Sequence, residues 1–424
     1  MAMTMAQKIL AHHSGLNEVT VGEFVTATID QVLLNDTFPD IDKGMIEAGI
    51  KGGLNTIWDR DRVAVLIDHH APAMERSVPI ATNHVVIREL VQKFALPHFF
   101  DLKAGICHQV MVEKGFALPG SLVVVPDSHT TTYGALNCGG TGIGETEMAW
   151  VLHFGELWFQ VPPSIKLELS GTVPDHVTAK DIFLHISRTY GTEFAQYKAL
   201  EWGGPVINDL SISDRLCLAN QSVELGAKFS LFPADQRVLD FLRDRAVRDF
   251  EPVMPDHDAD YEAVYEIDVS GLEPLVAQPH GLEVVNPVNH YRDVRINQAN
   301  IGGCANGRLE DIAWAARILK GKKIHKDVRC IVGPASWEVY KEAIREGYLE
   351  ALIDAGVIIS HPHCGPCTGI FGALASEEVC ITATSRNFKG RMGSPEANIY
   401  LASPLTVAAS AITGHITDPR EELH

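Results

Sequence analysis

The stretch His361-Pro362-His363-Cys364-Gly365-Pro366-Cys367 is the part of the sequence on which the assignment of fold and chemistry depends. It follows a short apolar run, residues 356–359, which predicts a buried strand. Two cysteines three positions apart on a Gly-Pro turn can direct both sulfurs at one centre. This geometry suits a dithiol redox pair, a zinc site or part of an iron–sulfur cluster. Taken alone, Cys-Gly-Pro-Cys favours the dithiol.

Length and composition indicate a globular enzyme-sized chain. With 424 residues, 46% of them hydrophobic and 21% charged, it is expected to form two or three domains. No apolar run approaches the roughly 20 residues that span a bilayer. The first residues lack a cationic start followed by an apolar block, so we expect a cytoplasmic protein. The net charge of −19 argues against a nucleic-acid partner, whose phosphates would be repelled.

Two Asp-His pairs follow predicted strands. Residues 62–67 predict a buried strand that ends in Asp68-His69, and residues 121–125 predict another that is followed by Asp127 and His129. Open α/β sheets place their sites just beyond the carboxyl ends of strands. An aspartate beside a histidine can orient the imidazole for acid–base work. The alternative is a pair of exposed loops. His108 lies in a similar position, after a helix predicted around residues 86–94.

Residues 134–144 are rich in glycine but do not match a dinucleotide-binding fingerprint. Counted from Gly140 or from Gly142, the last required glycine falls on Glu145 or on Glu147. The segment therefore predicts a tight turn that allows close helix packing.

The middle of the chain suggests two domain boundaries. A clean alternating strand at residues 165–169 follows a Pro-Pro break, and residues 235–279 form an acidic connector with short strands. We expect domains at residues 1–163, 164–284 and 285–424. Helices are predicted over residues 179–190 and 216–225. The second would put Asn220 and Glu224 on one face of the helix. That face either lines a functional site or is exposed to solvent.

The last domain has a strong α/β rhythm and supplies a third unusual cysteine. Its predicted elements are a helix at 310–319, a strand at 328–332, a helix capped by Ser336 and running to about residue 355, and a strand at 379–382. Cys304 lies in the loop Gly302-Gly303-Cys304-Ala305-Asn306-Gly307-Arg308, just before a helix start. Three cysteines without an obvious fourth suit a cubane cluster bound by three thiolates. Zinc stays open as well, since His361 or His363 could complete four ligands.

The remaining cysteines are expected in the core. They lie mostly in apolar surroundings, and eight cysteines in a chain of this length do not form a disulfide scaffold. These five residues are Cys107, Cys138, Cys217, Cys330 and Cys380.

The chain resembles the aconitase superfamily, and within it the large subunits of 3-isopropylmalate dehydratase and homoaconitase. The resemblance covers nearly the whole chain, and the motifs run in family order. They are Asp68-His69, Gly105-Ile106-Cys107-His108-Gln109, Glu113-Lys114-Gly115, Asp127-Ser128-His129-Thr130 with Tyr133-Gly134-Ala135, Cys304 with Asn306-Gly307-Arg308, Cys364-Gly365-Pro366-Cys367, and Arg386-Asn387-Phe388 with Gly390-Arg391-Met392-Gly393.

This resemblance implies three α/β domains around a central 4Fe-4S cluster with one open iron. The cluster ligands would be Cys304, Cys364 and Cys367, and the open iron would act as a Lewis acid. The implied reaction is reversible loss and addition of water on a hydroxy di- or tricarboxylic acid, most closely 3-isopropylmalate and 2-isopropylmalate. Homoaconitate or a methyl-substituted malate are alternative substrates. A non-catalytic cluster-binding protein is the alternative from another class.

The resemblance also implies roles for individual side chains. The residues expected to assist the leaving hydroxyl are Asp68, His69, His108, Asp127, His129 and Glu224. Those expected to hold the substrate are Asn220, Ser385, Arg386 and Arg391, where the arginines suit carboxylates because of their planar forks.

Several positions depart from the family pattern. Gly303 and Ala305 flank Cys304 where the family usually has serine and threonine, and Ser385 replaces an asparagine. Asn35-Asp36 replaces His-Asp, and Thr131 replaces a cysteine. These changes make the identity of the substrate the open question. No segment resembles the swivelling fourth domain of single-chain aconitases, so a separate small subunit is expected to supply the catalytic base.

Overall fold

The computed structural model describes residues 2–73 and 77–423, which divide into two compact units. Unit 1 contains Met1–Lys103, Cys107–Leu169 and Ala195–Ile267. Unit 2 contains Ala104–Ile106, Ser170–Phe194 and Asp268–His424. Each unit is built from segments that are distant in sequence. The finer division into three domains stays a prediction.

A five-stranded parallel sheet forms the centre of unit 1, in the order β4-β3-β2-β5-β6. The middle strands β3, β2 and β5 are buried along their whole length and are almost entirely apolar, as expected for a parallel sheet covered on both faces. The strands are β2 (Gln31–Leu34), β3 (Val63–Val65), β4 (His98–Phe99), β5 (Leu122–Val125) and β6 (Gly139–Gly142).

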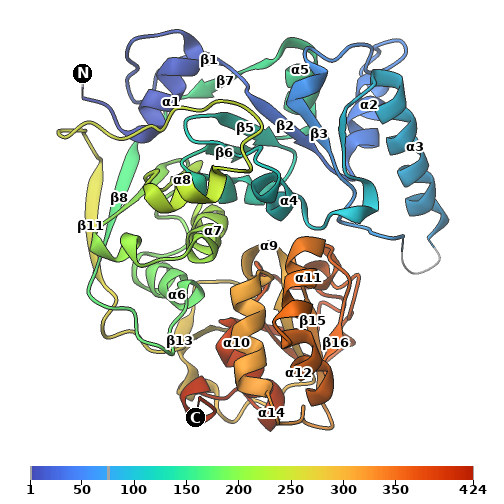
Figure 1. The fold of residues 1–424 in the computed structure, drawn as a ribbon, viewed down its shortest axis with the longest axis vertical. Helices are drawn as coiled ribbons and strands as arrows, with labels where there is room; N and C mark the ends of the chain where they lie inside the picture. The colour runs from blue at the N-terminus through green and yellow to red at the C-terminus, as the bar shows by residue number, and fades with distance from the viewer. Residues whose placement is uncertain (1, 74–76, 424) are drawn as a thin grey trace. The chain divides into compact units, whose positions relative to one another are not determined.

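Helices cover this sheet, as Figure 1 shows for the blue and cyan part of the chain. The first helix begins with a capping box between Thr4 and Gln7, which satisfies two of its free N–H groups. Helices α2 and α5 pack against each other. The helices are α1 (Met5–Ser14), α2 (Phe38–Glu47), α3 (Val78–Phe94), α4 (Cys107–Glu113) and α5 (Glu145–Phe154).

Two smaller sheets complete unit 1. One is the antiparallel pair β1 (Phe24–Thr28) and β7 (Glu156–Gln160). The other has the order β10-β9-β8-β11, beside two helices. These elements are β8 (Ser164–Ser170), β9 (Ala199–Gly203), β10 (Phe229–Leu231), β11 (Ala263–Asp268), α7 (Ile212–Gln221) and α8 (Gln236–Leu242).

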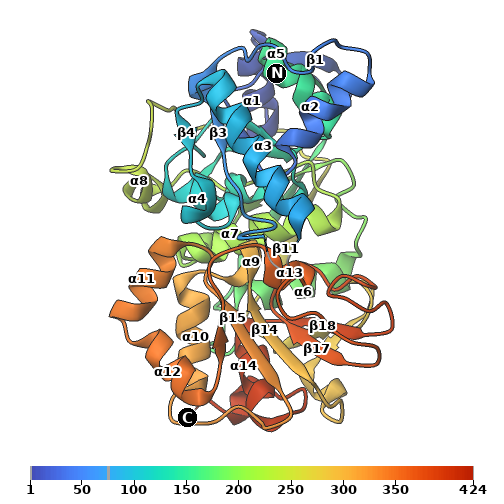
Figure 2. The ribbon, with the colours of Figure 1, turned by 90° about the vertical axis from the view of Figure 1, so that its right-hand side faces the viewer.

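Unit 2 has a seven-stranded sheet in the order β13-β12-β18-β17-β14-β15-β16. The strands from β18 to β16 are parallel and β12 is antiparallel to its neighbours. Figure 2 shows β14, β15, β17 and β18 side by side. The strands are β12 (Leu275–Ala277), β13 (Val285–Pro287), β14 (Gln298–Gly302), β15 (Arg329–Gly333), β16 (Ile358–Ile359), β17 (Val379–Thr382) and β18 (Asn398–Ala402).

The helices of unit 2 include two that pack tightly together, α10 and α14. They are α6 (Ala179–Tyr190), α9 (Gly303–Asn306), α10 (Leu309–Leu319), α11 (Trp337–Arg345), α12 (Tyr348–Ala355), α13 (Gly365–Thr368) and α14 (Pro404–Thr413). Short 3-10 helices in the two units are η1 (Arg60–Arg62), η2 (Asp101–Lys103), η3 (Ser128–Leu136), η4 (Pro205–Asn208), η5 (Ser222–Leu225), η6 (Val288–Tyr291) and η7 (Pro419–Glu421).

Most elements expected from the sequence pattern are present, and the exceptions have local causes. The helix after Ser336 is capped as predicted, but Gly347 adopts φ +74° and splits it into α11 and α12. The helix expected over residues 216–225 ends at Gln221 and continues as η5. The strand expected at residues 356–359 is a short edge strand in which Ile358 is 46% exposed, so the prediction of a buried strand is wrong.

Within the glycine-rich segment, Asn137 forms a turn with φ 63°, as predicted, and residues 139–142 continue as strand β6. A Cβ on Gly140 would lie 2.3 Å from the Thr130 carbonyl oxygen, and one on Gly142 would lie 2.5 Å from that of Asp127. Real Cβ atoms do not approach so closely. The glycines of β6 therefore allow η3 to pack directly against the strand.

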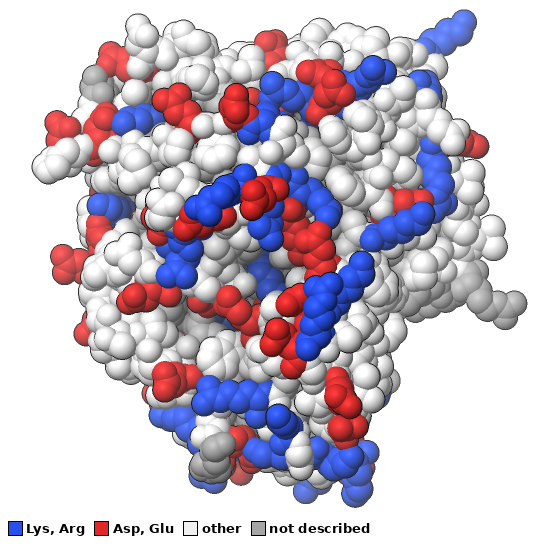
Figure 3. All heavy atoms as spheres, viewed as in Figure 1, with Lys and Arg blue, Asp and Glu red and all other residues white. Residues whose placement is uncertain are grey.

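The charged side chains are mixed over the visible surface. On the face drawn in Figure 3, lysines and arginines are interspersed with aspartates and glutamates, although the chain carries a net charge of −19. Across residues 2–73 and 77–423, none of the helices has the length and apolar character needed to cross a membrane.

Replacement of Gly142 by alanine is expected to destabilise unit 1. The added methyl group would displace the backbone at Asp127, which we expect to lower the free energy of unfolding by about 1–3 kcal/mol. Chemical denaturation followed by circular dichroism measures the change. Gly44→Ala is the control, because no atom lies within 4 Å of the place its Cβ would take and alanine favours a helix. Equal stability of the two variants would contradict this account.

Candidate active site

Three aspartates follow three neighbouring parallel strands of unit 1. Asp36 comes after β2, Asp68 after β3 and Asp127 after β5, and all three are largely buried. The carboxyl ends of parallel strands meet at one edge of the sheet, so the three carboxylates gather there. Two of the three were predicted as site residues from the strand-end pattern.

Asp127 is the centre of the resulting network. Its Oδ1 accepts a hydrogen bond from His108 Nε2 at 2.8 Å, and its Oδ2 lies 3.2 Å from His69 Nε2. The backbone N–H of His129 also donates to Oδ1 at 2.9 Å. Burial alone would raise the pKa of Asp127, but His108 and the other two histidines outweigh it and hold this pKa well below its usual range. The residue therefore stays an anion.

His69 connects Asp127 to Asp68. Its Nδ1 lies 2.8 Å from Asp68 Oδ1, while Nε2 faces Asp127. A ring nitrogen bonds to a carboxylate only as a donor, so both contacts are hydrogen bonds when the ring carries two protons. The second oxygen of Asp68 accepts the N–H of Cys107 at 2.7 Å, which ties the pair to the start of α4. Held between two carboxylates, the His69 ring can donate a proton and accept it again.

Asp36 is a site residue that was not predicted. Its carboxylate accepts the backbone N–H groups of Asp68 at 3.0 Å, His69 at 2.9 Å and His70 at 3.2 Å. Burial opposes ionisation, but His84, His69 and these N–H groups hold the pKa of Asp36 well below its usual range. The signal was present in the sequence, because Asp36 follows its strand as the other two aspartates do.

His108 and Tyr133 form a second bonded pair. The tyrosine hydroxyl lies 3.1 Å from Nδ1 of His108, whose Nε2 faces Asp127. Burial raises the pKa of Tyr133 well above its usual range, and the neighbouring Cys107 and Asp127 add to this effect. The phenol therefore remains a neutral donor that can fix the tautomer of His108.

Residues from α7 and η5 reach the same region. His129 Nε2 lies 3.1 Å from Glu224 Oε1, and Asn220 donates to Thr132 Oγ1 at 2.9 Å. Asn220 and Glu224 belong to different helices, contrary to the single helix expected, yet both side chains contact η3. The structure thus brings together all the site residues predicted in unit 1.

The three cysteines of the predicted cluster site lie in unit 2, again beyond strand ends. Cys304 follows β14 and Cys364 follows β16, and the exposed fractions of Cys304, Cys364 and Cys367 are 5%, 8% and 2%. A Cβ on Gly303 would lie 3.7 Å from that of Cys367, so the two cysteine turns are neighbours.

Arg391 lies among these thiols. Its Nε donates to the Cys367 carbonyl oxygen at 3.1 Å and its Nη2 lies 3.4 Å from the Cys367 sulfur. Burial would lower the pKa of Arg391, but its proximity to Cys367, Cys364 and Cys304 raises it above its usual range. The guanidinium is therefore within electrostatic reach of all three sulfurs, where it would stabilise negative charge on thiolates.

Hydrogen bonds fix the two cysteine turns. Asn300 on β14 donates to the Pro366 carbonyl oxygen at 2.8 Å. Arg308 donates to the carbonyl oxygens of Cys304 at 2.6 Å and Ala305 at 2.7 Å. Ser385 Oγ lies 3.4 Å from the sulfur of Cys304. The sulfurs are thus presented by rigid turns, which suits an inorganic cluster.

His363, beside Cys364, keeps the zinc alternative open, because its buried Nε2 forms no hydrogen bond among residues 2–73 and 77–423. His363 Nδ1 lies 2.8 Å from the His361 carbonyl oxygen, and the two rings are stacked with centroids 3.9 Å apart. The other nitrogen, Nε2, lies 2.3 Å from where a Cβ on Gly365 would be, so it faces the turn backbone. Burial lowers the pKa of His363 to about 4.

The predicted substrate arginines have different surroundings. The Arg386 guanidinium carbon lies 5.6 Å from the centroid of the Phe388 ring, within the range of a cation–π contact. Arg391 contacts Cys367, as described above. Their roles towards a substrate stay predictions.

Comparisons with known proteins give one family. The model of the aconitase family (aconitate hydratase) matches residues 7–293 and 282–414. The chain is 45% identical to 3-isopropylmalate dehydratase large subunit 1 of Methanopyrus kandleri, over 100% of both chains. It is 41% identical to the probable methanogen homoaconitase large subunit of Methanothermobacter thermautotrophicus, over 99% of this chain and 98% of that protein.

A solved structure has the same fold at low identity. The holo-form of Thermococcus kodakaraensis aconitase X matches with a TM-score of 0.50 and 12% identity, over 88% of this chain and 89% of that one. The sequence matches, and not this fold likeness, place the chain among the hydro-lyases. The chain belongs to the aconitase family, which confirms the resemblance found in its motifs. Proteins of this family bind a 4Fe-4S cluster, and the three buried cysteines are compatible with one.

Replacement of Asp36 by asparagine is expected to destabilise the protein in a pH-dependent way. Because the folded-state pKa of Asp36 is depressed, its stabilisation is complete above the ordinary carboxyl pKa of about 3.9 and is lost as the pH falls. We expect a loss of about 2 kcal/mol or more at neutral pH, where three N–H groups lose their anionic acceptor.

Urea denaturation of wild type and variant at neutral pH and at a pH of about 3, below the ordinary carboxyl pKa, measures this difference. The gap between the two proteins should narrow at the lower pH. Asp244→Asn, at an exposed position, should leave stability within about 0.5 kcal/mol at both values. A gap that is independent of pH would contradict the assignment.

Proposed function

We propose that this chain is the large subunit of a 4Fe-4S hydro-lyase that isomerises a hydroxy di- or tricarboxylic acid by removing and adding water. The substrate pair we favour is 3-isopropylmalate and 2-isopropylmalate. The observation that carries the proposal is the gathering of three buried thiols around the Arg391 guanidinium in a chain of the aconitase family.

The cluster would be held by Cys304, Cys364 and Cys367. These residues are buried, their turns accept hydrogen bonds from the Asn300 and Arg308 side chains, and Gly303 leaves room beside Cys367. With three protein ligands, the bound cluster would supply one open iron, a Lewis acid for a substrate hydroxyl and carboxylate. Arg391 would balance the negative charge of the thiolates.

The histidine–aspartate network of unit 1 would supply the acid for the leaving hydroxyl. His69, doubly bonded to Asp68 and Asp127, is the residue best prepared to donate a proton and recover it. The anionic Asp127 stabilises the protonated ring and orients His108 at the same time. Through Glu224, His129 is held in a fixed orientation beside them.

Substrate carboxylates and hydroxyls would be held by a second set of side chains. Arg386 offers a planar guanidinium, and Asn220 and Ser385 offer an amide and a hydroxyl. Ser385 lies beside the sulfur of Cys304, so it belongs to the surroundings of the cluster. We propose that these residues and the unit 1 network serve the same reaction.

A small subunit completes the proposal. The relatives that match this chain over its full length are named large subunits, which implies such a partner. We propose that the small subunit carries the swivelling domain and the catalytic base. The proposal also includes three domains, at residues 1–163, 164–284 and 285–424, and a cytoplasmic location, where eight reduced cysteines are expected.

A homoaconitase reaction is the second candidate. It is favoured by the 41% identity to a probable homoaconitase large subunit, close to the 45% identity to a dehydratase relative. The two reactions share the acid network and the cluster and differ in the group attached to the malate carbon.

Replacement of Cys304 by serine tests the cluster assignment. We expect the anaerobically purified wild-type chain to be brown, with broad visible absorbance that is lost in air, and the variant to be nearly colourless because one of three thiolate ligands is missing. Analysis of iron and acid-labile sulfide measures the cluster content per chain of wild type and variant. Cys330→Ala is the control, since this cysteine is buried in the core and is expected to leave the cluster intact.

Two results would overturn the assignment. One is a colourless anaerobic wild-type preparation with stoichiometric zinc. The other is a Cys304→Ser variant that keeps its iron while a dithiol redox activity depends on Cys364 and Cys367.

Activity is expected only with the partner. The isolated chain, even with a full cluster, should turn over no hydroxyacid at an enzymatic rate, and co-purification with the small subunit should restore turnover. A panel of 3-isopropylmalate, homoaconitate and methyl-substituted malate then identifies the substrate. The absorbance of the C=C bond should rise when a malate loses water and fall when homoaconitate, which is already unsaturated, gains it. Normal turnover by the isolated chain would show that no partner is needed.

A further inference from the structure

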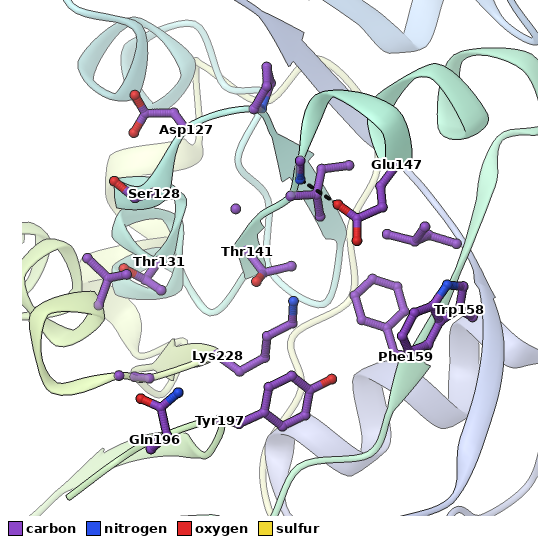
Figure 4. A pocket seen from close by; sticks show the side chains of 18 residues that line it. Asp127, Ser128, Thr131, Thr141, Glu147, Trp158, Phe159, Gln196, Tyr197 and Lys228 are labelled. Atoms are coloured by element: carbon purple, nitrogen blue, oxygen red, sulfur yellow. Dashed lines mark hydrogen bonds between the residues drawn. The ribbon is translucent and has the colours of Figure 1, made fainter. Parts of the chain in front are cut away.

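A pocket of about 530 Å³ opens on the other side of the loop that carries Asp127. It lies wholly within unit 1, and Figure 4 shows its lining. In this view the side chains of Asp127 and Ser128 point away from the centre of the pocket, whereas Lys228 points into it. The pocket is therefore separate from the histidine–aspartate network, although the two share a loop.

Lys228 gives the pocket a cation that is only half-buried and has no direct anionic partner. Among the described residues, no hydrogen bond or ion pair to its ammonium is formed, and its Nζ lies 5.6 Å from the Phe159 ring centroid and 5.7 Å from that of Tyr197. Burial lowers the pKa of Lys228, an effect that the nearby Glu147 carboxylate opposes. The ammonium contacts aromatic faces and lacks an acceptor.

Thr131 adds a second polar group without a partner. Its side chain is 1% exposed, and within residues 2–73 and 77–423 its Oγ1 makes no hydrogen bond. A buried hydroxyl with no partner costs free energy, so its presence beside a pocket indicates that a bound group can satisfy it.

One wall of the pocket is apolar and aromatic, whereas Thr141, Glu147 and Gln196 are polar members of the rest of the lining. Leu157, Trp158 and Phe159 come from β7 and line one side, and Trp158 is 58% exposed. Its ring lies 5.8 Å from that of Phe24 on the paired strand β1. Covering such an exposed indole with an apolar group removes apolar surface from water and therefore favours binding.

We propose that this pocket binds a small organic carboxylate with an apolar tail. The carboxylate would accept hydrogen bonds from the Lys228 ammonium and the Thr131 hydroxyl, and the tail would cover Trp158 and Phe159. Because Thr131 and His129 belong to the same 3-10 helix η3, an occupant would contact the segment that also carries part of the proposed acid site. The pocket thus adjoins the proposed acid site through η3.

Isothermal titration of the full-length chain with phenylacetate tests the proposal. We expect saturable binding with one site per chain, and weaker binding by at least about tenfold in Lys228→Met, because a charged hydrogen bond is lost. Thr131→Val should weaken binding roughly threefold while leaving stability equal or higher, since a methyl group replaces an unpartnered hydroxyl. Lys43→Met, at an exposed lysine of α2, is the matched control and should bind as the wild type does.

Two further ligands separate head group from tail. Acetate lacks the tail and benzyl alcohol lacks the charge, so each should bind more weakly than phenylacetate. The proposal is overturned if phenylacetate does not bind at millimolar concentration, or if Lys228→Met, shown to be folded by circular dichroism, binds it as tightly as Lys43→Met does. If Thr131→Val binds phenylacetate as tightly as the wild type, the Thr131 hydroxyl does not bond to the ligand.

Discussion

The parallel alignment of neighbouring strands is the constraint on which the candidate site depends. It brings Asp36 after β2, Asp68 after β3 and Asp127 after β5 to a single edge of the sheet, although these residues are far apart in the chain. The same arrangement in unit 2 presents Cys304 after β14 and Cys364 after β16. Each unit therefore uses its sheet in the same way, once for carboxylates and once for thiols.

Burial of these charged groups costs free energy unless hydrogen bonds or opposite charges compensate them. Asp36 is compensated by backbone N–H groups and Asp127 by imidazoles, so the first fixes a loop and the second stabilises protonated histidines. The thiols of unit 2 are compensated by Arg391. This compensation also fixes orientation. A carboxylate that accepts hydrogen bonds at both oxygens leaves its donors few other orientations. The network is consequently preorganised for proton transfer.

Local patterns predicted much of this structure, and long-range contacts account for what they missed. Strand-end position pointed to Asp68, His69, Asp127 and His129, with exposed loops as the alternative. The resemblance to the aconitase superfamily then implied roles for them and for the three cysteines. The same pattern is present at Asp36, where the departure of its neighbour from the family motif obscured it. The contact between Arg391 and Cys367 and the pocket at Lys228 depend on residues brought together by the fold, which no spacing rule reveals.

The glycine strand β6 has a consequence for how this protein can vary. Where Gly140 and Gly142 lie, the volume that side chains would fill is already taken by the backbone of η3, which carries His129. Substitution in the strand therefore cannot be accommodated by repacking of side chains, since the obstacle is main chain. Variation at this edge of the sheet is therefore confined to the side chains that η3 itself presents.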